Sequence, residues 1–238
     1  MTAQLTHASP KGFKKYLDII LSRYVHKAQY TIGAFPKEQA FHNRIWEWRL
    51  KANTYGVVDV TVPDGGRYEP TPYLIISETL NRLELTPTDV YVDLGCGKGR
   101  SLLMAARRNI KKVIGVEQDK GFLKIAEENF ARLGTIQPTV EFKNCLAQEF
   151  DYNDVTIIFM YNPFGGDTIN TVLDEIEKTL KTNPRHFRIA YVNPQHDNVL
   201  AQREWLEQYD CWHEAEFPDF EVYPYQPRGI SFWRYKSD

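Results

Sequence analysis

Val92-Asp93-Leu94-Gly95-Cys96-Gly97-Lys98-Gly99-Arg100 is the stretch of sequence that decides the fold. The apolar residues that lead into it predict a short strand ending in an acid, and the residues after Arg100 predict a helix. Glycine at every second position lets the backbone turn sharply and approach a ligand closely. A strand, a glycine loop and a helix N-terminus in this order favour a nucleotide-type site at the carboxyl edge of a parallel sheet.

The spacing of the loop separates two kinds of nucleotide. The glycines stand as Gly-x-Gly-x-Gly, whereas the dinucleotide fingerprint is Gly-x-Gly-x-x-Gly and places a helix N-terminus under a pyrophosphate. The negative charge of Asp93, just before the loop, is unfavourable beside phosphates. S-adenosylmethionine carries a sulfonium and an ammonium and no phosphate, so it suits an acid at this place. A second predicted strand ends in Glu117, at the distance where ribose hydroxyls are held.

These motifs together resemble those of class I S-adenosylmethionine-dependent methyltransferases. Residues 93–99 and 115–117 are similar to motifs I and II of that family, and the likeness continues through residues 68–73, 161–165 and 191–194. It covers roughly the last 170 residues, at the spacings expected of one such domain. The run is similar to a bacterial group of mostly unassigned substrate with a Tyr-Asn-Pro-Phe motif IV. Its first segment also resembles, more faintly, the non-SET histone-lysine methyltransferases.

Alternation of apolar strands with amphipathic helices predicts fold class α/β, a Rossmann-like class I methyltransferase sheet that is mostly parallel with an antiparallel final strand. We expect no helix between the last two strands. The expected strands are 90–94, 113–117, 139–143, 155–160, 187–192, 214–217 and 230–235, and the expected helices are 74–83, 100–108, 120–133, 168–180 and 198–209.

The N-terminal part of the chain is predicted to be a helical extension. We expect residues 1–67 to pack on the core and residues 68–238 to form the S-adenosylmethionine-binding methyltransferase domain. Ser9-Pro10 predicts a helix start, a second helix is expected over residues 36–52, and residues 57–62 alternate as a strand does. The apolar face of the second helix is expected to be buried and consists of Phe41, Ile45 and Trp48.

Composition bounds the setting and the partners. The 238 residues carry a net charge of −2, which argues against nucleic acid as a partner. Residues 11–51 nevertheless hold nine Lys/Arg against three Asp/Glu, and we expect these charges to form a solvated face. The sequence has no run of apolar residues long enough to span a membrane, no signal-peptide pattern, and three cysteines without metal-type spacing. A cytoplasmic protein without a metal site is therefore expected.

The cofactor site is predicted from the motifs. Asp93 is expected to hold the ammonium of S-adenosyl-L-methionine and Glu117 both ribose hydroxyls. Leu146 stands where many relatives have an acid for the adenine amino group, so we expect it to stack on the ring instead. Lys98 and Arg100 are expected to point to solvent. The predicted cofactor-binding residues are Tyr68, Thr71, Asp93, Gly95, Cys96, Gly97, Glu117, Gln118, Cys145, Leu146 and Asn162.

The acceptor side is predicted from the end of the fourth core strand. Tyr161-Asn162-Pro163-Phe164 resembles the motif of amino-group methyltransferases with one proline missing. Asn162 is expected to accept an N–H bond and aim a nitrogen lone pair at the methyl group, with Tyr161 and Phe164 beside it. An aromatic, acidic loop over residues 217–227 is a second candidate for the acceptor pocket.

The predicted function is transfer of a methyl group from S-adenosylmethionine to a nitrogen, either of a protein lysine or of a small-molecule amine. Two alternatives stay open: an O-methyltransferase that uses His196 as its base, and a non-catalytic S-adenosylmethionine-binding protein. The sequence gives neither the acceptor nor the oligomeric state.

Overall fold

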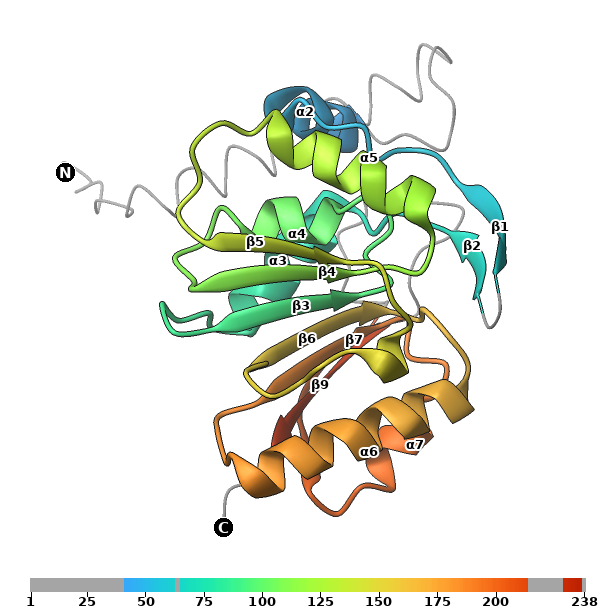
Figure 1. Ribbon diagram of the computed structural model, residues 1–238, viewed down its shortest axis with the longest axis vertical. Helices are drawn as coiled ribbons and strands as arrows, with labels where there is room; N and C mark the ends of the chain where they lie inside the picture. The colour runs from blue at the N-terminus through green and yellow to red at the C-terminus, as the bar shows by residue number, and fades with distance from the viewer. Residues whose placement is uncertain (1–40, 63–64, 214–228, 237–238) are drawn as a thin grey trace, which may run out of the picture.

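The computed structural model describes residues 41–62, 65–213 and 229–236, and a seven-stranded sheet lies at the centre of this part of the chain (Figure 1). Its order is β5-β4-β3-β6-β7-β9-β8. The strands are β3 (Val90–Leu94), β4 (Lys112–Val116), β5 (Thr139–Lys143), β6 (Ile157–Tyr161), β7 (Arg188–Val192), β8 (Leu206–His213) and β9 (Gly229–Tyr235).

The direction of the strands confirms the predicted fold class. The five strands from β5 to β7 pair in parallel, and β9 pairs antiparallel with both β7 and β8. The chain runs from β3 outward to β5 and then returns to β6 beside β3. This reversal of direction leaves a crevice beyond the carboxyl ends of β3 and β6, which is where open α/β sheets bind ligands.

Helices cover both faces of the sheet (Figure 1). On one face α3 (Tyr73–Arg82) packs on α4 (Arg100–Ala105), which in turn contacts α5 (Lys120–Ala131). On the other face lie α6 (Gly166–Thr182) and α7 (Asp197–Ala201), together with the short 3-10 helix η1 (Ala147–Glu149).

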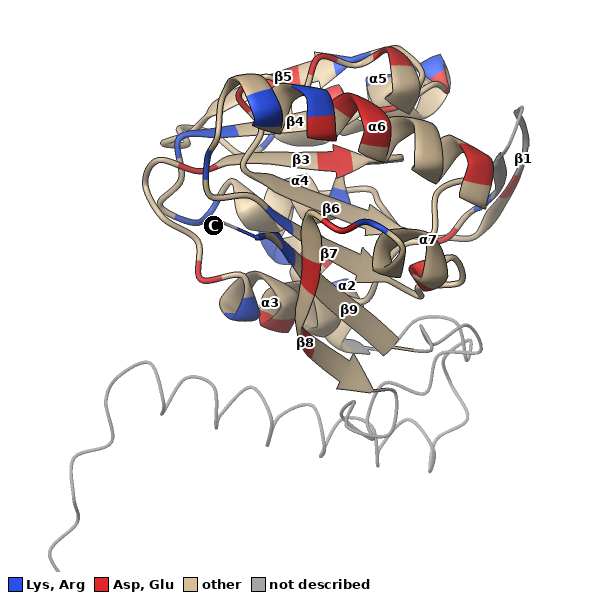
Figure 2. Cartoon of the chain, turned by 90° about the horizontal axis from the view of Figure 1, so that it is seen from below, with Lys and Arg blue, Asp and Glu red and all other residues tan. Residues whose placement is uncertain are grey.

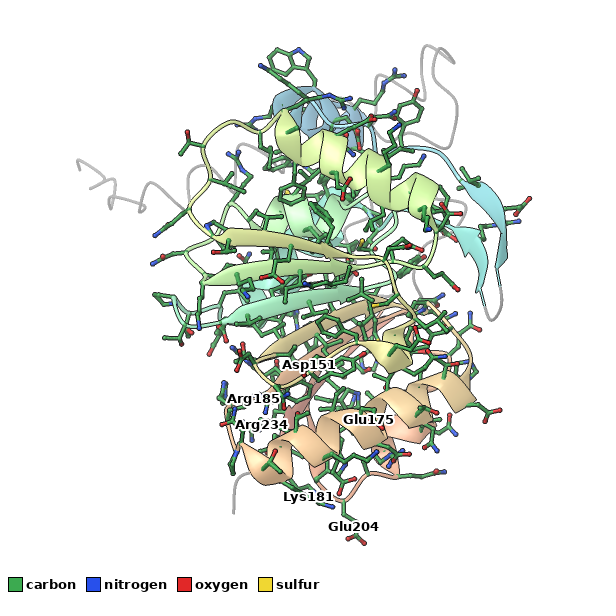
Figure 3. The ribbon with its side chains drawn as sticks, in the orientation of Figure 1. Asp151, Glu175, Lys181, Arg185, Glu204 and Arg234 are labelled. Atoms are coloured by element: carbon green, nitrogen blue, oxygen red, sulfur yellow. The ribbon has the colours of Figure 1, made fainter. Side chains whose placement is uncertain are left out.

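Two apolar clusters separate along the same faces because side chains alternate along each strand. On β3, for example, Tyr91 joins the α3–α4 side and Val92 the α6 side. Side chains fill the space between sheet and helices (Figure 3). Charged residues gather on the helices and leave most of the sheet uncharged (Figure 2). An acidic residue, Asp93, nevertheless lies near the end of β3.

The described part of the N-terminal extension is small. It consists of α2 (Phe41–Leu50), β1 (Val58–Val62) and β2 (Gly65–Tyr68), with β1 and β2 paired antiparallel. The predicted helix that begins at Ser9 lies outside the described residues. The division of the chain after residue 67 stays a prediction, since α2 packs directly on α3 of the core.

The buried face of α2 differs from the predicted one. Trp48 was expected inside but is 79% exposed, whereas Asn43, Glu47 and Leu50 are buried. Asn43 accepts a hydrogen bond from the backbone N–H of Tyr73 at 3.0 Å. The apolar spacing misled the prediction because the polar residues of this helix find partners inside the protein, which removes the usual penalty for their burial.

The predicted helix over residues 198–209 is wrong in its second half. The helix α7 ends at Ala201, and β8 already begins at Leu206. Leu206 and Trp212 of this strand are buried, and Arg82 of α3 donates to the Asp210 carboxylate at 2.9 Å. Pairing with β9 therefore determines the extended conformation of a stretch whose local sequence pattern also fits a helix. The predicted strand at 214–217 lies outside the described residues.

Candidate functional site

A cavity of about 390 Å³ opens at the carboxyl ends of β3, β4 and β6, in the crevice that the sheet topology creates. Segments far apart in the sequence line it: the β2–α3 connection, the glycine loop, the β5–η1 loop and the turn after β6. Every residue predicted for the site is among them: Tyr68, Thr71, Asp93, Gly95, Cys96, Gly97, Glu117, Gln118, Cys145, Leu146, Tyr161, Asn162 and Phe164.

The glycine loop passes so close to its neighbours that side chains are excluded. Gly95 has a φ of +72° and Gly97 a φ of +53°, a region that L-residues rarely adopt. A β-carbon on Gly97 would lie 2.4 Å from the ring of Tyr68, and one on Gly95 would lie 2.8 Å from the side chain of Pro163. The loop therefore leaves its backbone bare toward the cavity, as close contact with a ligand requires.

Asp93 places a carboxyl group in the cavity wall, where the side chain is nearly inaccessible to solvent. It is 4% exposed, and the hydroxyl of Ser101 donates to its Oδ2 atom. Burial raises the pKa of Asp93 to about 8, with the charge of Glu117 adding to the shift and the Ser101 hydrogen bond opposing it. A cationic ligand is the partner that such a carboxylate lacks, because an opposite charge would restore its ionised form.

Glu117 follows β4 and is held in place by the backbone. Its Oε2 atom accepts the N–H of Gly97 at 2.9 Å, and its Oε1 atom accepts the N–H of Asp119 at 2.8 Å. The backbone N–H groups of the loop and of the start of α5 thus fix the orientation of the carboxylate at the cavity wall. Burial raises the pKa of Glu117. This fits the predicted ribose contact, which requires an acceptor of fixed orientation.

Tyr68 covers the glycine loop from the extension side. Its hydroxyl donates to the Thr54 carbonyl at 2.6 Å, and its ring lies 4.9 Å from that of Phe122. Lys98 was expected to point to solvent, but it is buried: its Nζ atom lies 4.7 Å from the centre of the Tyr68 ring and donates to the Tyr55 carbonyl at 2.9 Å. Lys98 thus ties the loop to the segment that covers it.

Arg100 is likewise not exposed. It is 3% exposed and forms an ion pair with Glu47 of α2 at 3.0 Å. Its Nε atom donates to the hydroxyl of Thr54 at 2.7 Å, and another nitrogen donates to the carbonyl of Thr71 at 3.1 Å. The first residue of α4 therefore anchors both α2 and the β2–α3 connection to the cofactor side of the core. The sequence prediction missed this role because the partners stand 29 to 53 residues away.

The turn after β6 positions Asn162. Its φ of +39° is unusual for a residue other than glycine, and such strain concentrates at functional sites. The hydroxyl of Tyr191 on β7 donates to Asn162 Oδ1 at 3.0 Å and accepts the backbone N–H of His196 at 3.3 Å. The sequence indicated Tyr191 only as part of the family likeness over residues 191–194, and nothing in the local sequence predicts its hydrogen bond to Asn162.

Glu69 is a second residue that sequence reasoning missed. It lines the cavity, and the hydroxyl of Tyr161 donates to its Oε1 atom at 3.3 Å. Burial raises the pKa of Glu69, while Tyr161 and the charge of Arg67 oppose the shift. The cavity therefore presents a half-buried carboxyl group beside the Tyr161-Asn162 turn, in addition to those of Asp93 and Glu117.

The residue considered as a base for an oxygen acceptor does not reach the cavity. His196 is not among its lining residues. Its ring lies beside α6, where a β-carbon on Gly166 would be 3.4 Å from its Nδ1 atom. The loop at 217–227 lies outside the described residues. Leu146 does line the cavity and leaves the place of the adenine acid apolar.

The chemistry of the site suits S-adenosylmethionine. A bare glycine loop, a buried carboxyl group for a cation and an oriented carboxyl group for a diol stand around one cavity. The fold and the site together define a cofactor-binding α/β protein of the methyltransferase type.

Known proteins support this assignment. A family model described as a methyltransferase domain matches residues 92–183. A protein-lysine N-methyltransferase of Saccharolobus islandicus is 31% identical over 134 residues, which are 54% of this chain and 81% of that protein. A histone-lysine N-methyltransferase of Dictyostelium discoideum, specific for H3 lysine 79, is 30% identical over 125 residues, 48% of this chain and 7% of that protein.

A solved structure agrees with the fold. An RNA methyltransferase of Salinibacter ruber, in complex with S-adenosyl-L-homocysteine, has a TM-score of 0.53 and 20% identity over 71% of this chain and 95% of that one. The chain belongs to the class I S-adenosylmethionine-dependent methyltransferases and uses that cofactor as methyl donor. No helix of the described residues has the length and apolar character needed to cross a membrane.

Proposed function

We propose that this enzyme methylates the side-chain nitrogen of a lysine in a protein. The observation that carries the proposal is the likeness to the Saccharolobus islandicus protein-lysine N-methyltransferase, because it extends over 81% of that protein. The Dictyostelium discoideum relative also acts, by its name, on a lysine. The proposal keeps the predicted nitrogen acceptor and selects the protein lysine over a small-molecule amine.

The acid-lined cavity supports an amine acceptor. A lysine arrives as an ammonium, since its ordinary pKa is about 10.4, and must lose a proton before its nitrogen can attack. Glu69 lines the cavity beside Tyr161 and Asn162, where it is suited to attract the ammonium and to receive one of its protons. Asn162 Oδ1 keeps a lone pair beyond the one that accepts from Tyr191. This atom is suited to hold a remaining N–H and so to direct the nitrogen lone pair.

The remaining predicted residues take up binding roles in this proposal. Asp93 holds the ammonium of the donor and Glu117 holds its ribose hydroxyls, with Tyr68 and the glycine loop around them. When bound, S-adenosylmethionine supplies a methyl group on a sulfonium, which already activates the leaving group. The lysine nitrogen forms the new bond to carbon as the carbon–sulfur bond breaks. The protein therefore contributes mainly proximity, orientation and exclusion of water.

An oxygen acceptor has less support. It would require a general base within hydrogen-bond reach of a hydroxyl, and His196, the residue considered for this role, does not line the cavity. Substitution His196→Ala is therefore expected to leave methyl transfer unchanged.

The test uses the full chain, labelled S-adenosylmethionine and peptides that each contain one lysine, with matched peptides carrying arginine in its place. We expect a mass gain on lysine peptides alone, located on the side-chain nitrogen by fragment spectra. A gain on free amines or hydroxyl compounds, with none on any lysine peptide, would overturn the proposal.

The role of Glu69 has its own readout. The variant Glu69→Gln is expected to lose activity near pH 7 and to recover it toward pH ~10, where free lysine loses its proton unaided. Glu204→Gln changes the same kind of group at the opposite end of the molecule from α2 (Figure 3) and is the matched control. If the dependence of activity on pH is the same for Glu69→Gln and Glu204→Gln, Glu69 does not accept the proton of the lysine.

A further inference from the structure

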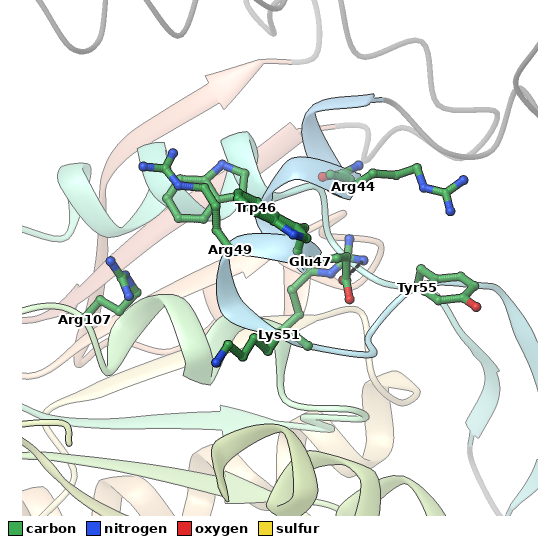
Figure 4. Close-up of a pocket in the computed structure, with 11 residues that line it drawn as sticks. Arg44, Trp46, Glu47, Arg49, Lys51, Tyr55 and Arg107 are labelled. Atoms are coloured by element: carbon green, nitrogen blue, oxygen red, sulfur yellow. Dashed lines mark hydrogen bonds and ion pairs between the residues drawn. The ribbon is translucent and has the colours of Figure 1, made fainter. Parts of the chain in front are cut away.

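A second cavity, of about 730 Å³, lies on the outer side of α2 (Figure 4). We call it the α2 groove. Most of its lining residues differ from those of the cofactor cavity: among the residues that the structure describes, Arg100 alone lines both. Its lining comes from α2, from the segment that follows it, and from α4 with the turn after it, and includes the cations Arg44, Arg49, Lys51 and Arg107 and the rings of Trp48 and Tyr55.

The α2 groove has an excess of positive charge. Glu47 and Arg100 at its base neutralise each other in the buried ion pair described above. The side chains of Arg44, Arg49, Lys51 and Arg107 are all exposed. Within the described part of the chain, none of these four forms an ion pair with a carboxylate. Four cations therefore line one hollow, and none has an anionic partner among the residues that the structure describes.

Aromatic rings stand between these cations. Trp48 is 79% exposed and Tyr55 52% exposed, and the guanidinium of Arg49 lies 5.2 Å from the centre of the Trp46 ring. Both exposed rings line the same cavity, so they are not single apolar residues scattered over the surface. The guanidinium of Arg49 is thus held over Trp46, and the exposed faces of Trp48 and Tyr55 are a stacking surface for planar groups.

We propose that the α2 groove binds a single-stranded segment of nucleic acid. Phosphates supply the anions that the four cations lack, and bases supply planar rings for Trp48 and Tyr55. A groove of positive charge with aromatic side chains is the combination that binds single strands with little sequence preference. An acidic peptide also supplies anions, but its carboxylates leave the exposed rings without a stacking partner.

The net charge of the chain does not oppose this proposal. The value of −2 averages over the whole molecule, whereas binding depends on the local field. Figure 2 shows acidic residues spread along α6, on the other face of the sheet from α2. Because Arg100 borders both cavities, a strand in the groove would lie next to the cofactor side of the enzyme. The proposal is independent of the lysine acceptor proposed above.

The test is a fluorescence anisotropy titration of the full chain with labelled oligo(U) and oligo(dT) of equal length, repeated at several salt concentrations. Binding of the RNA strand alone assigns the groove to RNA, and binding of both assigns it to single strands in general; each supports the proposal. Each phosphate contact contributes about 0.7 to the slope of log K against log salt for single strands. The four cations should therefore give a slope of at most about 3.

Substitutions of a ring and of two cations in the α2 groove locate the binding. Trp48→Ala should weaken it about 5- to 150-fold, the range for loss of one stacked base, whereas Trp48→Phe should retain most of it. Arg49→Ala combined with Lys51→Ala should reduce the salt slope by about 1.4. Lys181→Ala, on α6 at the opposite end of the molecule (Figure 3), is the matched charge control and should change neither value.

The outcomes separate the alternatives. No binding by the wild type, or equal weakening by Lys181→Ala, would overturn the proposal. So would binding of a glutamate-rich peptide with equal affinity and equal dependence on Trp48, because the groove would then be a site for acidic proteins. Binding of S-adenosylmethionine by each variant serves as the folding control, since no substituted residue lines the cofactor cavity.

Discussion

Substitution Asp93→Asn tests the link between stability and cofactor binding. Asp93 is nearly inaccessible to solvent, and burial raises its pKa to about 8, far above the ~3.9 of an aspartate in an unfolded chain. Between these two values the folded protein holds a proton that the unfolded chain has released. The cofactor-free protein is therefore most stable below pH ~4 with respect to this group, and that stability is lost as the pH rises toward 8.

The magnitude follows from the two pKa values. At pH 7, about three units above the unfolded pKa, Asp93 is still protonated in the folded state. Each unit corresponds to 1.36 kcal/mol, so keeping this proton costs about 4 kcal/mol of folding free energy at pH 7. Asparagine is neutral in both states and still accepts the Ser101 hydrogen bond, so the variant avoids this cost. For a chain of this size, about 4 kcal/mol corresponds to a rise in Tm of about 8–16 °C.

The assay is thermal unfolding with and without S-adenosylmethionine at pH 5 and pH 7. We expect Asp93→Asn to be the more stable protein without cofactor, by about 4 kcal/mol at pH 7 and about 1.5 kcal/mol at pH 5. We also expect it to lose most of the stabilisation that the cofactor gives the wild type, because the variant lacks the carboxylate that we propose to meet the ammonium. A gap that is independent of pH, or a variant less stable than the wild type, would refute the reasoning.

Asp89→Asn is the matched control with the opposite sign. Burial alone would raise the pKa of Asp89, but hydrogen bonds from Thr86 and Thr156 and the ion pair with Arg188 lower it. Its contribution to stability is present above its unfolded pKa and is lost as the pH falls. Asp89→Asn should therefore destabilise the protein at pH 7, which shows that burial of a carboxyl group alone does not decide the result.

The other predictions concern the loop, the extension and the turn after β6. Gly97→Ala should weaken cofactor binding, measured by calorimetry, more than tenfold, because the new β-carbon would lie 2.4 Å from the ring of Tyr68. Gly134 also has a positive φ but has nothing within 4 Å of such a β-carbon, so Gly134→Ala should leave cofactor binding intact. Arg100→Met should lower the free energy of unfolding in urea by about 3–5 kcal/mol, since the buried Glu47 carboxylate loses its cationic partner and keeps only hydrogen bonds from Thr54 and Tyr73; a loss below ~1 kcal/mol would contradict this. Tyr191→Phe should lower kcat about 2- to 10-fold without changing cofactor affinity, as expected for one lost hydrogen bond; an unchanged kcat would remove its positioning role.

The position of the predicted donor residues around one cavity could be inferred from the sequence because the signals for it are local. The strand before Asp93, the glycines after it and the second strand before Glu117 each impose their conformation within a few residues. Parallel strands then bring their carboxyl ends to one edge of the sheet. Sequence spacing therefore translates directly into neighbouring positions around the cavity, and no long-range contact needs to be known in advance.

Lys98 and Arg100 show that local sequence patterns do not predict burial that depends on distant partners. A charged residue in a loop is expected outside, because burial of an unpaired charge is costly. Here the partners come from the extension: the Tyr55 carbonyl for Lys98 and Glu47 for Arg100. The same pairing places Glu47 inside and turns Trp48 outward. One unforeseen ion pair thus accounts for errors in two separate segments.

The acceptor half of the site depends on contacts of this second kind. Glu69 meets Tyr161 across 92 residues, and Tyr191 meets Asn162 across 29, so neither pair has a spacing that a motif can record. The donor is the same throughout the family and needs the same local motif, whereas an acceptor is recognised by side chains that different elements bring together. The order of experiments follows from this difference. Variants at Asp93 test a role that the sequence already predicts, while variants at Glu69 and Tyr191 test what only the folded chain assembles, and these bear on the proposed nitrogen acceptor.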